Sequence, residues 1–101
     1  MVQGLSQVKS KLLVMAILAE DMVDRSVKAL LEGDAAMAHQ VCEDDDQLDR
    51  LEAEVDELVV QILAAGFEPK DLRAITISMK ISNDIERIGD EASTIASSVI
   101  H

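Results

Sequence analysis

Apolar residues recur along the chain at alternating steps of three and four positions, in three long segments. Steps of this size place side chains on one side of an α-helix, so each segment is predicted to be an amphipathic helix. No run alternates apolar and polar residues as a half-buried strand does. The predicted core positions are Leu5, Val8, Leu12, Met15, Ala19 and Met22, widened by Leu13, Ile17, Val27 and Leu31; then Val41, Leu48, Leu51, Val55, Leu58 and Ile62; and finally Leu72, Ile75, Met79, Ile81, Ile85, Ile88, Ala92, Ile95 and Val99.

Glycine, aspartate and proline mark the ends of the three segments. Gly33 and Gly66 follow helical patterns and suit the left-handed conformation that closes a helix. Asp34 is a good N-cap, and Pro69 suits a first helical turn. The predicted helices run over about 5–32, 34–65 and 69–100.

Connections this short require neighbouring helices to run antiparallel. The predicted fold is therefore all-α, an up-down-up antiparallel three-helix bundle. Its 101 residues suit a single domain over residues 1–101. With one Phe and no Trp or Tyr, the core must be aliphatic.

The charge balance narrows the classes of partner. Twenty Asp and Glu against nine Lys and Arg give a net charge of −11. That argues against nucleic acid and against an anionic bilayer, and favours metal cations or a basic protein surface. The eight-residue run "LLVMAILA" is too short to cross a membrane, and Cys42 is the single cysteine. We expect a cytoplasmic protein without direct membrane insertion.

Two acidic stripes run beside the predicted core positions. Asp45, Asp49, Glu52 and Asp56 are spaced 4-3-4 in the second helix, and Asn83, Glu86 and Asp90 are spaced 3-4 in the third. In antiparallel helices the two stripes could lie on the same side of the bundle. One interpretation is a solvated flank of the core, neutralised by Lys and Arg. The other is a cation site of oxygen ligands, which suits Mg, Ca, Mn or Fe better than Zn.

Other chemistry is poorly supported. His39 and His101 lie away from the stripes and are interpreted as surface residues. The sequence has no nucleophile–base pair and no Gly-rich phosphate loop, so the protein is predicted not to be an enzyme.

The order of the motifs carries more information than their chemistry. The stretch "VCEDDDQLDRLEAEVDELVVQILA", then Pro69 with "DLR", then "ISNDIERIGDEASTIA" resembles the repeat of the PhoU family. Members of that family regulate phosphate uptake in bacteria and archaea. The resemblance implies a three-helix bundle whose E(D)xxxD motifs bind multinuclear metal clusters, iron or zinc among them.

Carried over by position, the resemblance implies a set of metal ligands and a cofactor. The ligands are Asp49, Glu52, Asp56, Glu86 and Asp90, with Asp45 one turn further along. The cofactor would be divalent or trivalent metal ions: iron, zinc, manganese or magnesium. Thr94 departs from the family, which often has Asn there.

The resemblance also implies a function and partners. The predicted function is a regulatory, metal-binding interaction protein of phosphate homeostasis that contacts the phosphate-importer ATPase and a sensor kinase. One alternative is a soluble domain of a sodium–phosphate cotransporter, acting on the membrane part of that transporter. Another is a carboxylate bundle whose bound metal is itself the function. Most family members have two repeats and this chain has one, so a homodimer is expected, with Val59 and Val60 as exposed apolar positions.

Overall fold

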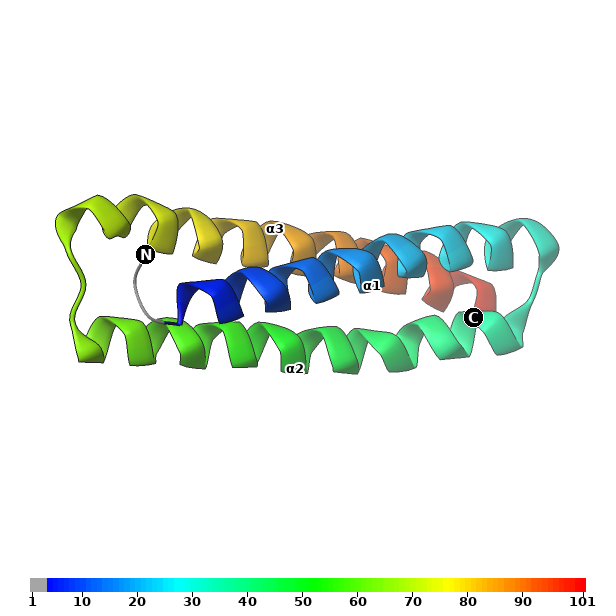
Figure 1. The fold of residues 1–101 in the computed structure, drawn as a ribbon. Helices are drawn as coiled ribbons and strands as arrows, with labels where there is room; N and C mark the ends of the chain where they lie inside the picture. Colours follow the sequence, from blue (N-terminus) through cyan, green and yellow to red (C-terminus); the bar gives the residue numbers. More distant parts are fainter. Residues whose placement is uncertain (1–3) are drawn as a thin grey trace.

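Three long helices make up the computed structural model, which describes residues 4–101 (Figure 1). They are α1 (Leu5–Glu32), α2 (Ala35–Ala65) and α3 (Pro69–Ile100). α1 and α3 run in the same direction, α2 runs in the opposite direction, and each helix contacts the other two. The Cα extents are 51 × 17 × 16 Å. The predicted up-down-up three-helix bundle is confirmed. Of the predicted domain 1–101, the first three residues lie outside the described part.

The connection between α1 and α2 follows from its capping residues. Gly33 has φ 67° and ends α1, and the Asp34 N–H donates to the Ala29 carbonyl at 2.9 Å. The Met37 N–H then donates to the Asp34 carboxylate at 3.0 Å, which caps α2. Two residues, Gly33 and Asp34, thus reverse the chain and fix α2 antiparallel to α1.

The connection between α2 and α3 uses a different set of signals. Gly66, with φ 99°, ends α2. Pro69 occupies the first turn of α3, where its missing N–H costs nothing, and Asp71 lies near the positive end of the helix dipole.

In the described residues, no helix has the length and apolar character that a bilayer span requires.

The core is aliphatic, as predicted. It is built from side chains of all three helices, and the larger fully buried ones are Val8, Met15, Met22, Val41, Leu48, Val55 and Ile75. Burying an aliphatic side chain of this size contributes about 1.5–3 kcal/mol to folding.

The predicted core of α3 is partly wrong. Ile75, Ile85 and Ala92 are buried, but the line between them passes through Ser82 and Gly89. The predicted core positions Leu72, Met79, Ile81 and Ile88 are 41–45% exposed. Small residues on the inner face allow α3 to approach the methionine and leucine side chains of α1 and α2, and this closeness leaves the bulkier isoleucines on the flank.

Two further predictions of burial are wrong. The four residues expected to widen the core face of α1 are exposed: Leu13, Ile17, Val27 and Leu31. Val59, expected to be exposed, is 3% exposed and belongs to the core, whereas its neighbour Val60 is 56% exposed. The apolar surface available to partners is therefore distributed differently from the sequence prediction.

Candidate metal centre

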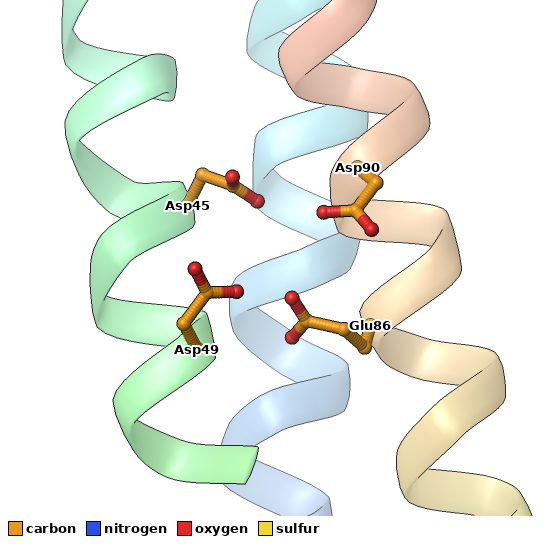
Figure 2. Close-up of side chains that lie close together, drawn as sticks. All are labelled: Asp45, Asp49, Glu86 and Asp90. Carbon is orange, nitrogen blue, oxygen red and sulfur yellow. The ribbon is translucent and has the colours of Figure 1, made fainter. Parts of the chain in front are cut away.

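Four carboxylates from two helices come together on one side of the bundle. Asp45 and Asp49 project from α2, and Glu86 and Asp90 project from α3 (Figure 2). One oxygen atom from each of the four residues lies within 4.8 Å of the others. Exposed acidic side chains often cluster without a bound cation. The burial, hydrogen-bond partners and neighbouring charges of these four carboxylates therefore decide whether they could bind one.

Helix geometry explains how the four residues meet. Each pair is spaced four residues apart, so its members lie one turn apart on the same side of their helix. Because α2 and α3 are antiparallel, Asp45 lies opposite Asp90 and Asp49 lies opposite Glu86 (Figure 2). The two i, i+4 pairs therefore form a square of carboxylates across the boundary between the helices.

A glycine allows the two helices to approach this closely. Gly89 is buried next to Asp90, and a Cβ at this position would lie 2.2 Å from Leu48 Cδ2. Leu48 is itself fully buried, next to Asp49. The core contact and the carboxylate group therefore occupy adjacent positions on both helices.

Two of the carboxylate oxygens lack a hydrogen-bond donor. Asp45 Oδ1 and Glu86 Oε2 are buried and have no hydrogen-bond partner in the described part of the chain. Their neighbours in the group are also carboxylates, which accept hydrogen bonds and cannot donate when ionised. Only a proton, a water molecule or a cation can satisfy these oxygens.

The pKa values reflect this shortage of positive charge. Burial raises the pKa of Glu86 to about 8, with further contributions from the adjacent carboxylate of Asp49 and from the charges of Glu52 and Asp90. Burial and the charges of Asp49 and Asp90 raise the pKa of Asp45 to about 6. The pKa of Glu52 is also raised, by burial and then by the charge of Asp56. Glu86 therefore holds a proton near neutral pH, and Asp45 gains one in mildly acidic solution, unless another cation replaces these protons.

Two basic side chains of α1 and α3 pair with carboxylates outside the group of four. Arg25 of α1 pairs with Asp21 at 2.8 Å and also with Asp44. Lys80 is 3.5 Å from Asp84. Over residues 4–101, no salt bridge joins a Lys or Arg to any of the four clustered carboxylates. The interpretation of this stripe as a flank neutralised by Lys and Arg therefore finds no support at the cluster itself.

The structure places the predicted ligands in two sets. Asp49, Glu86 and Asp90 belong to the group of four, and Asp45, which the sequence placed one turn away from the main set, completes it. Glu52 and Asp56 lie outside that group, although the charge of Asp90 raises the pKa of Glu52. The i, i+4 spacing places each of these pairs on one side of its helix, whereas the pairing of Asp45/Asp49 with Glu86/Asp90 depends on how far the two helices are offset. Metal binding by either set stays a prediction.

Comparison with protein families gives a match over most of the chain. The model of the PhoU domain matches residues 12–99. A phosphate-specific transport system accessory protein PhoU homolog from Pseudomonas aeruginosa is 46% identical over 94 residues, which cover 91% of this chain and 38% of that protein. A protein of the same name from Aquifex aeolicus is 34% identical over 98 residues, covering 95% of this chain and 44% of the relative.

A solved structure agrees with the fold. The crystal structure of PhoU from Pseudomonas aeruginosa superimposes with a TM-score of 0.92 at 44% identity, over 96% of this chain and 47% of that one. The chain thus spans less than half the length of these relatives. The relatives are named as accessory proteins of transport, which agrees with the prediction of a non-enzymatic protein. The match of the domain model over residues 12–99 shows that this chain belongs to the PhoU family.

Proposed function

We propose that this chain is a regulatory, metal-binding interaction protein of phosphate transport. The relatives' names support the link to phosphate transport. The metal proposal is supported by one observation above all: four carboxylates from α2 and α3 meet with two buried oxygens that lack a donor.

The donor set fits a hard metal cation. All four side chains offer oxygen, the ligand atom that Mg, Mn and iron ions prefer, and no cysteine or histidine belongs to the group. Asp45, Asp49, Glu86 and Asp90 would hold the ion, with Glu52 beside them. A bound cation would supply the positive charge that the group lacks, and would join α2 to α3 at this surface.

The proposed regulation of phosphate transport acts through partner binding. The proposed partners are the phosphate-importer ATPase and a sensor kinase, met in the cytoplasm. Metal occupancy changes the surface charge between α2 and α3 and so changes what a partner meets there. A homodimer is proposed as the working assembly, with exposed Val60 available for contact, whereas buried Val59 is not.

The second candidate function is that of a soluble domain that acts on the membrane part of a phosphate transporter. A bundle whose only function is metal binding is a third candidate, which predicts metal retention without partner binding.

Elemental analysis tests the metal site. The protein is equilibrated with Mn²⁺, Fe²⁺, Zn²⁺ or Mg²⁺, passed over a desalting column and compared with two double variants, Asp45→Asn/Asp49→Asn and Glu86→Gln/Asp90→Asn. Both are expected to lose the metal that the unmodified protein retains. The matched control is Glu43→Gln/Glu57→Gln, which removes the same charge from exposed positions of α2.

The result separates the candidate functions. Metal retained by the control and lost by both double variants supports a site shared between α2 and α3. Binding of the purified importer ATPase, measured with and without metal, then tests regulation. Equal retention by all four proteins would refute the metal site.

A further inference from the structure

A second surface lies between α1 and α3, separate from the carboxylates between α2 and α3. It is a groove of about 300 Å³ lined by Ala16, Ala19, Glu20, Val23, Asp24, Ile85 and Ile88. Five of these seven residues are apolar, and Ile88 is 43% exposed. The groove therefore has an apolar floor with two carboxylates on the α1 side.

Exposed apolar residues of α1 lie beside this groove and beyond it in both directions along the helix. Leu13 and Ile17 each precede a lining residue by three positions, and Val27 and Leu31 follow lining residues on the same side of the helix. Their exposed fractions are 57%, 69%, 41% and 80%. The strip from Leu13 to Leu31 covers 18 steps of the helix, about 27 Å at 1.5 Å per residue.

The opposite wall of the strip is also apolar. Ile81 of α3 is seven residues before Ile88, which places it on the same flank two turns away, and it is 41% exposed. Monomeric proteins seldom gather this many large exposed apolar side chains along one groove without a binding role. We define Leu13, Ile17, Val27, Leu31, Ile81 and Ile88, with the groove between them, as the α1/α3 strip.

Two acidic side chains lie at the middle of the strip. Glu20 and Asp24 are exposed, and they stand one helical turn apart on the groove. Among residues 4–101 neither takes part in a salt bridge. No ion pair within the described residues therefore occupies these two carboxylates, and both are open to a Lys or Arg side chain of an incoming partner.

We propose that the α1/α3 strip binds a basic amphipathic helix of a partner protein. The apolar side chains of that helix, at steps of three and four, fill the groove between α1 and α3. Its Lys or Arg side chains lie opposite Glu20 and Asp24. A helix laid in an apolar groove derives affinity from the buried side chains, and the charges fix its register.

The same charges argue against a second copy of this chain as the occupant. Glu20 and Asp24 lie symmetrically about Met22, the midpoint of the strip. An antiparallel pair of α1 helices would place Glu20 against Asp24 of the other copy, and a parallel pair would place each carboxylate against itself. Both arrangements bring like charges together beside an apolar surface. An anionic bilayer is repelled for the same reason.

This inference is independent of the metal site, because the strip and the four carboxylates occupy different sides of α3. A variant that loses metal is expected to keep helix binding, and a variant of the strip is expected to keep metal. Failure of one proposal can thus be told from failure of the other.

Fluorescence anisotropy with a designed peptide tests the proposal. The probe is a labelled helical peptide of about 20 residues, matching the length of the strip, with Leu and Ala on one face and Lys flanking that face in its middle turns. A second peptide replaces Lys by Glu. The protein variants are Ile17→Asp, Glu20→Gln/Asp24→Asn and the charge-matched control Glu43→Gln/Glu57→Gln.

The basic peptide is expected to bind the unmodified protein and the control with similar affinity. Ile17→Asp, at a 69% exposed position, should fold normally and weaken binding at least about tenfold. Glu20→Gln/Asp24→Asn should weaken binding about fivefold at low salt. The acidic peptide should not bind. Amide NMR shifts caused by the basic peptide should cluster on α1 and α3 around the strip.

Other results would overturn the proposal. Equal affinity for Ile17→Asp and the unmodified protein, or shifts centred on the carboxylates between α2 and α3, would indicate general attraction between a cation and an acidic protein. A dimer in light scattering that Ile17→Asp converts to monomer, without peptide binding, would assign the strip to a second copy.

Discussion

Gly89 of α3 packs directly against Leu48 of α2, so closely that a Cβ at Gly89 would lie 2.2 Å from Leu48 Cδ2. The next residue on each helix is a carboxylate of the group of four, Asp90 and Asp49. The packing of the core and the spacing of the carboxylates are thus fixed by the same contact.

Gly89→Ala is expected to destabilise the protein, although alanine is the better helix former. The added methyl group must displace a fully buried leucine, and overpacking of this kind costs about 1–3 kcal/mol. The higher helix propensity of alanine offsets about 1 kcal/mol of this destabilisation. Urea unfolding should show a net loss of stability, and metal retention should fall because α2 and α3 move apart.

Leu48→Ala supplies the matched background for that measurement. It removes the atoms that the new methyl group meets, so Gly89→Ala should become neutral or stabilising when added to Leu48→Ala. Destabilisation of the same size in both backgrounds would show that contact with Leu48 is not the reason for glycine at this position.

The sequence predicted the helices well because their ends carry strong local signals. Gly33, Asp34, Gly66 and Pro69 each act within a few residues of themselves. The core of α3 was harder to predict, because apolar character alone marked Ile81 and Ile88. Ser82 and Gly89 are buried for a different reason, the close approach of other helices, which depends on tertiary packing and is invisible in a single segment.

The carboxylate group was predicted in part for a related reason. The acidic stripes and their side of the bundle follow from helical spacing. Which residues face one another depends on how α2 and α3 are offset along their axes. That offset brings Asp45 into the group and leaves Asp56 outside it. Spacing within one helix could not distinguish these two residues.

The metal-free protein is expected to lose stability as the pH rises. The pKa of Glu86 is raised from 4.5 to about 8 and that of Asp45 from 3.8 to about 6, so the folded state binds more protons than the unfolded state between these values. Stability then falls with pH across this window. In urea titrations with a chelator, the free energy of unfolding should be about 1–3 kcal/mol lower at pH 8.5 than at pH 5. A free energy of unfolding that stays flat or rises over this range would contradict the prediction.

Glu86→Gln is expected to stabilise the metal-free protein at pH 8. The change removes a half-buried charge from among like charges, and an amide N–H can donate to a neighbouring carboxylate. The free energy of unfolding is expected to rise by about 1–2 kcal/mol at pH 8. This increase should shrink towards pH 5, where Glu86 is already protonated. Glu43→Gln, at an exposed position of α2, is the control and should change stability by less than about 0.5 kcal/mol. A loss of stability in Glu86→Gln at pH 8 would mean that Glu86 is paired with a cation in the purified protein.

Asp45→Asn and Asp56→Asn distinguish the two sets of candidate ligands. Asp45 belongs to the group whose oxygens lie within 4.8 Å of one another, and Asp56 does not. Titration with Mn²⁺, followed by calorimetry, should show at least about a tenfold loss of affinity for Asp45→Asn and little change for Asp56→Asn. Both variants remove one carboxylate from α2, so the general effect of charge on cation binding is the same in each. A larger loss of affinity in Asp56→Asn than in Asp45→Asn would place the ion further along α2, at the Glu52 and Asp56 pair implied by the family resemblance. The group of four would then be a proton-binding cluster beside the metal site.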